Sequence, residues 1–220
     1  MELDAGRAPS TATATTGPTP EVLAETVAAL ATALKLDAAA AEPAITQAVV
    51  EAAGRSGARV ADLDGRLKEN DSLERKIRNR ALEQNLPLEA AAGEIHDVLR
   101  YTVVLRPDQF GRVMNELLNT LAQMGHSVPP NAIANYFRNG NRYKAVHADL
   151  YSTTGYAYEI QFHTEVSLFT KRETDALYSV FRDVKTPKPV RAQILRKLIG
   201  ASESIPTPEG LDELPQRASL

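Results

Sequence analysis

The clearest pattern of hydrophobic and polar positions is a strict alternation between residues 156 and 164. The apolar positions are Tyr158, Ile160 and Phe162, and the polar positions are Glu159, Gln161 and His163. A period of two predicts a β-strand with one face in the core. The other face then carries a carboxylate, an amide and an imidazole spaced about 7 Å apart. This row is typical of the floor of an active site, and equally typical of a polar strand that faces solvent.

Upstream of this strand, apolar residues recur at helical spacing. Thr19 offers an N-cap and Pro20 suits the first helical position, so an amphipathic helix is predicted to start there. Pro43 is expected to open a second helix, which Gly54 ends. The predicted helical segments are 20–36, 43–54, 58–84 with a break near 70–72, and a short turn at 90–94.

The second half of the chain mixes strand and helix patterns. Residues 98–105 are rich in β-branched and aromatic side chains and stop before Pro107, which predicts a strand. The turn at 153–155 links two further strands as a hairpin. The remaining predicted elements are a helix at 108–124, strands at 143–151 and 156–164, and helices at 165–183 and 188–199. This order predicts an α+β fold with a mixed β-sheet flanked by helices.

Composition divides the chain into a leader, one domain and a tail. Residues 1–18 are mainly Ala, Thr, Pro, Ser and Gly, which predicts a disordered leader. A single domain is expected over 19–200 and a flexible tail over 201–220. No apolar run approaches the roughly 20 residues that span a bilayer. No signal peptide is visible, so a secreted protein would be represented here by its processed form.

Charge and cysteine content exclude several kinds of function. The chain has 220 residues, a net charge of −3 and no cysteine. The lack of cysteine excludes disulfides, thiol catalysis and cysteine-ligated metal. The slightly acidic balance speaks against a nucleic-acid or membrane surface, so a phosphate site would need a local basic cluster. The sequence leaves the oligomeric state open, with a monomer as one option.

Such a basic cluster follows Gly65. Its members are Arg66, Lys68, Arg75, Lys76, Arg78 and Arg80. Acidic residues interleave with them, which is also typical of a solvated helix with i,i+4 ion pairs. Ser72 shifts the balance from a solvated helix toward a phosphate site. A hydroxyl at the start of a helical turn, between cationic side chains, suits a phosphate group.

Two further segments carry candidate chemistry. Asp97 stands at the entrance of the predicted strand 98–105, where a carboxylate is a common Mg²⁺ ligand and also a common turn residue. An HD-type metal phosphohydrolase is excluded, because no upstream helical histidine accompanies His96. In the segment 139–147, Tyr143 enters a strand and could stack on a base or pack in the core. The chain has no P-loop and no dinucleotide-binding glycine motif.

In chain order these pieces resemble the synthetase domain of RelA/SpoT-type alarmone synthetases. The motifs are G-R-x-K-x-x-x-S-x-x-R-K from Gly65, the aspartate before a strand, Tyr143 to His147, and Glu159-Ile160-Gln161. The resemblance covers roughly residues 60–183. It implies an ATP:nucleotide 3′-pyrophosphotransferase of the nucleotidyltransferase-like fold, which moves pyrophosphate from ATP to the 3′-hydroxyl of a purine nucleotide and releases AMP.

The resemblance also implies roles for individual residues. ATP-binding positions are Arg66, Lys68, Ser72, Arg75 and Lys76; acceptor-binding positions are Asn141, Tyr143, Lys144, His147 and Gln161. Asp97 and Glu159 are expected to hold Mg²⁺ and to be catalytic, with Glu159 acting on the acceptor hydroxyl. Tyr143 is expected to stack on the acceptor base. Strand alternation points Lys144 away from Tyr143.

The chain departs from the family mainly on the acceptor side. Thr102, Arg142, Ala145 and His163 stand where the family usually has other residues, so guanine preference is open. The short, leader-bearing form is similar to the secreted nucleotide 3′-pyrophosphokinases of actinomycetes, so secretion is expected, with a cytoplasmic location as the alternative. Two rival functions stay open. One is a toxin that pyrophosphorylates the 3′ end of tRNA, and the other is a non-catalytic nucleotide-binding module.

Overall fold

The computed structural model describes residues 19–129, 131–183 and 185–211. Over these residues the centre of the fold is a five-stranded sheet in the order β1-β2-β5-β4-β3. Its strands are β1 (Arg59–Ala61), β2 (Arg100–Val104), β3 (Ile133–Asn135), β4 (Val146–Tyr151) and β5 (Ala157–His163). β2 and β5 are parallel and the other pairs are antiparallel. The predicted α+β class with a mixed sheet is therefore confirmed.

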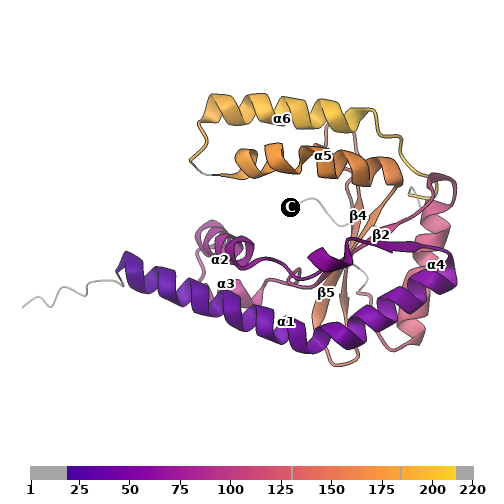
Figure 1. Ribbon diagram of the computed structural model, residues 1–220, viewed down its shortest axis with the longest axis horizontal. Helices are drawn as coiled ribbons and strands as arrows, with labels where there is room; N and C mark the ends of the chain where they lie inside the picture. Colours follow the sequence, from indigo (N-terminus) through magenta and orange to yellow (C-terminus); the bar gives the residue numbers. More distant parts are fainter. Residues whose placement is uncertain (1–18, 130, 184, 212–220) are drawn as a thin grey trace, which may run out of the picture.

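Helices cover the sheet and extend beyond it. They are α1 (Pro20–Ser56), α2 (Asn70–Gln84), α3 (Leu88–Gly93), α4 (Phe110–Gln123), α5 (Glu165–Arg182) and α6 (Lys188–Glu203). In Figure 1, α5 and α6 lie side by side, with α2 facing α5 from the side of α1. The main core joins α1 and α4 to the apolar face of the sheet. Leu168 at the start of α5 packs on Ala61 and Val104 in a second, small cluster.

The first helix is longer than its sequence pattern suggested. The expected division at Pro43 is wrong, because α1 runs through this proline without a break. Proline removes one backbone donor from a helix interior, which normally breaks or kinks it. Here the buried stripe continues across the proline, and four alanines at 38–41, which are strong helix formers, precede it. The stripe is formed by Ala31, Ala38, Ile45 and Ala52, seven residues apart.

The expected helical region from residue 58 is also wrong in its first part. Gly57 ends α1 in the left-handed conformation, and residues 59–61 then pair with β2 as the edge strand β1. A 3₁₀ turn, η1 (Leu63–Gly65), follows, and α2 starts only at Asn70. The three-residue strand β3 was not anticipated either, because so short a segment has no measurable alternation.

The C-terminal segment is packed rather than loose up to Leu211. α6 continues to Glu203, and Ile205 and Leu211 are buried in the main core. The backbone N–H of Gly111 donates to the carbonyl of Glu209 over 3.0 Å. The domain therefore extends beyond the expected end at residue 200. The predicted leader 1–18 and the end of the predicted tail, 212–220, lie outside the described residues. Over the described residues, every helix is too short or too polar to cross a bilayer.

Candidate active site

The alternating strand is confirmed as β5, and both of its faces are buried. Tyr158, Ile160 and Phe162 are fully buried in the main core. On the other face Glu159 is 8% exposed, Gln161 is 9% exposed and His163 is fully buried. The polar face is therefore covered, and the alternative of a solvent-facing strand is excluded.

Above this polar face lies a cleft of about 810 Å³. One wall is formed by residues of α2 and the other by residues of α5, while the floor is formed by residues of β2, β4 and β5 and of the loop before β4. Lys68, Ser72, Arg75, Lys76, Asp97, Asn141, Tyr143, His147 and Gln161 all line the cleft. The structure thus gathers nine of the predicted site residues, drawn from four segments of the chain, around one space.

Asp97 is clamped by two lysines at one end of the cleft floor. Its carboxylate accepts hydrogen bonds from Nζ of Lys68 and, over 2.6 Å, from Nζ of Lys76. Burial raises the pKa of Asp97, but attraction to Lys68 and Lys76 outweighs it and holds the pKa well below its ordinary value. Burial also lowers the pKa of Lys68 to about 8 despite the nearby carboxylate. Within the cleft, the Asp97 carboxylate is therefore the shared counter-charge of Lys68 and Lys76.

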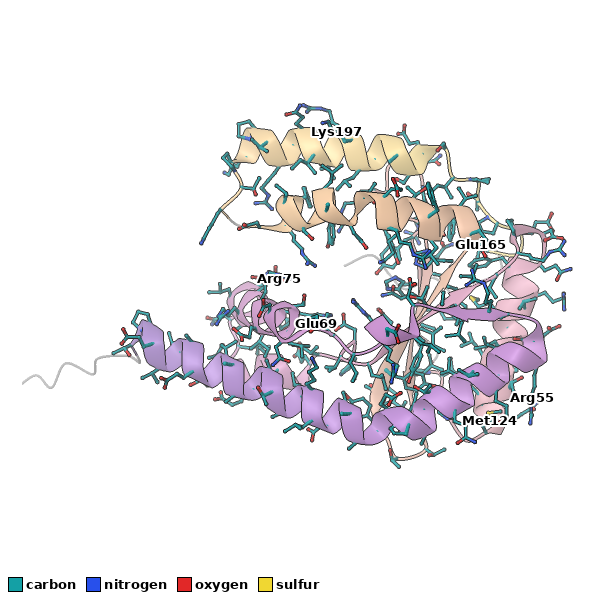
Figure 2. All side chains as sticks on the ribbon, viewed as in Figure 1. Arg55, Glu69, Arg75, Met124, Glu165 and Lys197 are labelled. Carbon is teal, nitrogen blue, oxygen red and sulfur yellow. The ribbon has the colours of Figure 1, made fainter. Side chains whose placement is uncertain are left out.

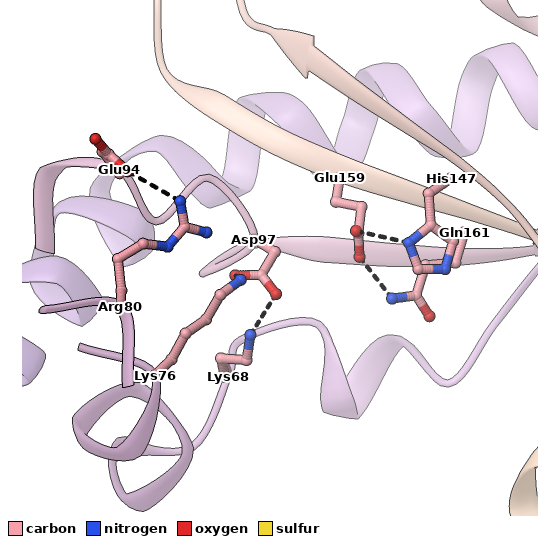
Figure 3. A network of polar contacts seen from close by, with 8 residues as sticks. All are labelled: Lys68, Lys76, Arg80, Glu94, Asp97, His147, Glu159 and Gln161. Atoms are coloured by element: carbon pink, nitrogen blue, oxygen red, sulfur yellow. Dashed lines mark hydrogen bonds and ion pairs between the residues drawn. The ribbon is translucent and has the colours of Figure 1, made fainter. Parts of the chain in front are cut away.

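Glu159 is held by a different pair of partners. Its Oε2 lies 2.9 Å from Nδ1 of His147, and its Oε1 accepts a hydrogen bond of 2.5 Å from the amide of Gln161. Burial raises the pKa of Glu159, and His147 and Gln161 bring it below its ordinary value. Figure 3 shows Asp97 and Glu159 as neighbours, each with its own partners. Glu159 is not among the cleft-lining residues, and His147 and Gln161 screen it.

Tyr143 connects this site to the start of α5. Its hydroxyl lies 3.0 Å from Nε2 of His147 and 3.0 Å from Nε2 of His163. Nδ1 of His163 in turn lies 2.9 Å from Oγ of Ser167, which also completes the capping box of α5. Five side chains therefore form one hydrogen-bonded chain from Ser167 to Glu159. Burial raises the pKa of Tyr143, whereas burial lowers the pKa of His163 to about 3, which keeps this imidazole neutral.

Two predicted contacts lie elsewhere. Nε of Arg66 pairs with Oε1 of Glu42 on α1 over 2.5 Å, and Arg66 does not line the cleft. Lys144 is buried, and its ammonium binds the carbonyl of Arg138 rather than pointing into the cleft. The expected contacts of Arg66 with ATP and of Lys144 with the acceptor therefore stay predictions. Each side chain would have to leave its present partner to reach a ligand in the cleft.

Several cleft residues were not found from the sequence. The loop contributes Arg142 and α5 contributes Lys171, Tyr178 and Arg182, while Arg100 lies on β2. Their sequence positions could have revealed Arg100 and Arg142, because Arg100 follows Asp97 by three residues and Arg142 directly precedes Tyr143. The α5 residues carried no such signal, because only the tertiary structure brings α5 opposite α2.

The donor set suits a magnesium ion only in part. No group of three or more His, Asp or Glu side chains that could hold a metal occurs in the part of the chain that the structure describes. Asp97 and Glu159 supply two carboxylates, and Mg²⁺ usually takes one or two carboxylates together with phosphate oxygens and water. The residues would therefore fit a Mg²⁺ that arrives with a nucleotide only after the two lysines leave Asp97 and after His147 and Gln161 uncover Glu159.

No family model matches the chain, and no curated protein sequence matches it. Solved structures with a similar fold include a chain of the complex between the Type VI effector Tas1 and its immunity protein. That chain is 20% identical, with 85% of this chain and 97% of the other covered and a TM-score of 0.44.

Two further structures are similar at the same level. For small alarmone synthetase 1 from Bacillus subtilis bound to its product pppGpp, identity is 16%, coverage is 66% and 72%, and the TM-score is 0.43. For a GTP pyrophosphokinase family protein from Streptococcus pneumoniae, identity is 11%, coverage is 83% and 87%, and the TM-score is 0.44. At these values the likeness carries no argument about function.

Proposed function

We propose that this chain transfers a pyrophosphoryl group from ATP to the 3′-hydroxyl of a purine nucleotide and releases AMP. The observation that carries the proposal is that two carboxylates, each with its own set of partners, lie beside one cleft. Asp97 lies between the ammonium groups of Lys68 and Lys76, and Glu159 lies beneath His147 and Gln161. One centre suits the phosphates of a donor and the other suits the hydroxyl of an acceptor.

The donor side is the wall formed by α2. Ser72 lies in the first turn of this helix, where backbone N–H groups and the positive end of the helix dipole favour phosphate. Lys68 and Lys76 reach the same place and are bound to Asp97 in the free protein. A triphosphate would replace Asp97 as the partner of the lysines. Asp97 would then become available as a ligand.

Asp97 and Glu159 would hold Mg²⁺, which would neutralise charge on the β- and γ-phosphates. In the reaction the acceptor O3′ forms a bond to the β-phosphorus, and the bond from that phosphorus to the oxygen it shares with the α-phosphate breaks. AMP leaves with that oxygen. The proton of the 3′-hydroxyl passes to Glu159, whose carboxylate is kept ionised by His147 and Gln161.

The acceptor side is built around Tyr143. This residue lines the cleft, and its hydroxyl is fixed by His147 and His163. The ring is therefore held in place to stack on a purine. Gln161, His147 and Asn141 supply polar groups at the floor of the cleft.

The proposal is tested by incubating the purified protein with ATP, Mg²⁺ and, in turn, AMP, GMP, GDP, GTP or tRNA. Products are separated by anion-exchange chromatography. We expect AMP together with a more highly charged nucleotide. Glu159→Gln should abolish transfer while the circular dichroism spectrum is retained. ATP binding without any AMP release would instead support the non-catalytic module, and a labelled tRNA product would support the toxin.

A further inference from the structure

A second cavity, of about 500 Å³, lies apart from the cleft and is not used by the proposed reaction. Its walls are the middle of α1, the turn 152–156 between β4 and β5, and His126, which follows α4. None of the described residues lines both this cavity and the cleft. A ligand in this cavity, which we call the α1 cavity, would therefore not compete directly with a ligand in the cleft.

Part of the α1 cavity is apolar and already formed. Three alanines of α1, Ala40, Ala41 and Ala44, line it, and their short side chains leave space that larger residues would fill. Tyr156 lines the cavity from the turn, and its half-buried ring packs against the main core. Its backbone N–H donates to Oγ of Ser152 over 3.0 Å, which holds the turn in shape. This combination suits the apolar body of a small ligand.

The charge of the α1 cavity is negative. Asp37 lines it, and no lysine or arginine is among its lining residues. Within the part of the chain that the structure describes, Asp37 forms no ion pair. The positions three and four residues away on the helix hold only alanine and leucine, so they offer no cation. Lys35 pairs instead with Glu69, at the start of α2, over 3.6 Å (Figure 2).

The two titratable neighbours of Asp37 in the cavity leave this charge without compensation. Burial raises the pKa of Tyr156 to about 12, and repulsion from Asp37 contributes, so the phenol stays protonated near the carboxylate. Burial lowers the pKa of His126, so its imidazole is neutral at pH 7. Nδ1 of His126 lies 2.7 Å from the hydroxyl of Tyr158, which fixes the ring. The cavity therefore offers hydrogen-bonding groups and one carboxylate, but no positive charge.

These features select the class of ligand. A phosphate or another anion would meet Asp37 and no cationic side chain. A divalent metal ion needs several ligands, and no group of three or more His, Asp or Glu that could hold one occurs among the described residues. We propose that the α1 cavity binds a small organic amine, with its ammonium group at Asp37 and its apolar body against the three alanines and Tyr156. The inference does not depend on the proposed function.

The test uses 2-phenylethylamine as the probe, because this molecule joins an ammonium group to an apolar body. Neutral 2-phenylethanol and anionic 3-phenylpropionate have similar shapes and serve as controls. Binding to the full chain is followed by ligand-observed NMR titration. The amine should bind at least roughly tenfold more tightly than either control, the gain expected for one charged hydrogen bond. Equal binding of the anion, or no binding of the amine at roughly 10 mM, would overturn the proposal.

Three variants then locate the binding site, with circular dichroism as the check on folding. Asp37→Asn removes the charge at an exposed helix position and should weaken amine binding roughly tenfold. Ala44→Leu fills the apolar part and should weaken it by a similar factor or more. Glu25→Gln is the matched control, because it removes one negative charge from α1 outside the cavity.

Two results would contradict the assignment. Equal losses in Asp37→Asn and Glu25→Gln would mean that the amine is attracted to the acidic chain as a whole and not to the cavity. Tighter binding of a capped lysine than of 2-phenylethylamine would place a protein side chain in the cavity instead of a small amine. Unchanged binding in Glu25→Gln, with losses in both cavity variants, is the outcome that we expect.

Discussion

The hydroxyl oxygen of Tyr143 lies 3.0 Å from Nε2 of His163, and the same oxygen lies 3.0 Å from Nε2 of His147. A phenol has one proton, so it donates to one imidazole and accepts from the other. The Glu159 carboxylate only accepts, so Nδ1 of His147 donates to it. The chain ends on the Glu159 carboxylate, which is held in place by His147 and by the amide of Gln161.

Removing the Tyr143 hydroxyl should separate stacking from orientation. Tyr143→Phe keeps the ring and breaks the chain, so kcat should fall roughly tenfold while the acceptor KM stays within about threefold. Tyr143→Ala removes the ring as well, so the acceptor KM should rise far more than the KM for ATP. Steady-state kinetics with each substrate varied in turn provides the measurement. A Tyr143→Phe enzyme with wild-type kcat would show that the chain has no part in turnover.

His163 should make the fold sensitive to mild acid. Its folded pKa of about 3 lies below the ordinary histidine value of about 6.5, so between these values only the unfolded state binds the proton. Stability attributed to this group is therefore complete above pH 6.5 and is lost as pH falls toward 3, with a limiting slope of about 1.4 kcal/mol per pH unit. His163→Gln should flatten urea-denaturation stability between pH 4 and about 6.5.

A second histidine contributes to the same pH dependence, because burial also lowers the pKa of His126. The effect of His163 is therefore measured as the difference between His163→Gln and wild type. His126 is present in both proteins, so its slope cancels in the difference. Parallel stability curves for His163→Gln and wild type would mean that His163 binds its proton over the same pH range in the native and unfolded states.

Asp97→Asn should destabilise the free protein as well as abolish transfer. Lys68 has a side chain only 10% exposed and would lose its counter-charge, for which about 3 kcal/mol or more is typical. Lys76→Met is the matched comparison, because it removes one partner of Asp97 and leaves the ion pair with Lys68 intact. The side chain of Lys76 is also more exposed, at 33%. The loss of stability in Lys76→Met should be smaller. Urea denaturation measures both, and equal losses would argue against the buried clamp.

The packed C-terminal segment provides a stability test remote from the cleft. A Cβ at Gly111 would lie 2.5 Å from the carbonyl oxygen of Gly210, so Gly111→Ala should cost roughly 1–3 kcal/mol. Gly200 in α6 has no atom near its Cβ direction, and Gly200→Ala should stabilise by about 0.5–1 kcal/mol. Thermal denaturation distinguishes the two. A Gly111→Ala protein of wild-type stability would mean that residues 205–211 do not dock on α4 in solution.

Local patterns in the sequence determined the individual elements well where one period was dominant. The alternation around Glu159 predicted β5, and the apolar stripe of 108–124 predicted α4 with its stop at Gly125. Local rules failed where tertiary packing was stronger. Pro43 did not break α1, because a buried face on both sides of it kept the helix intact. The edge strand β1 is stabilised by its pairing with β2, a partner about 40 residues away in sequence.

The sequence by itself determined which residue types are available for phosphate and proton chemistry, because motifs record spacing along the chain. Only the tertiary structure decided how they are paired. It joined Lys68 and Lys76 to Asp97, joined His147 to Glu159, and brought Arg182 opposite Arg75. These are contacts between distant segments, whose geometry is fixed by strand register and helix packing. Charge balance and hydrogen-bond direction depend on that geometry, and no local pattern encodes it.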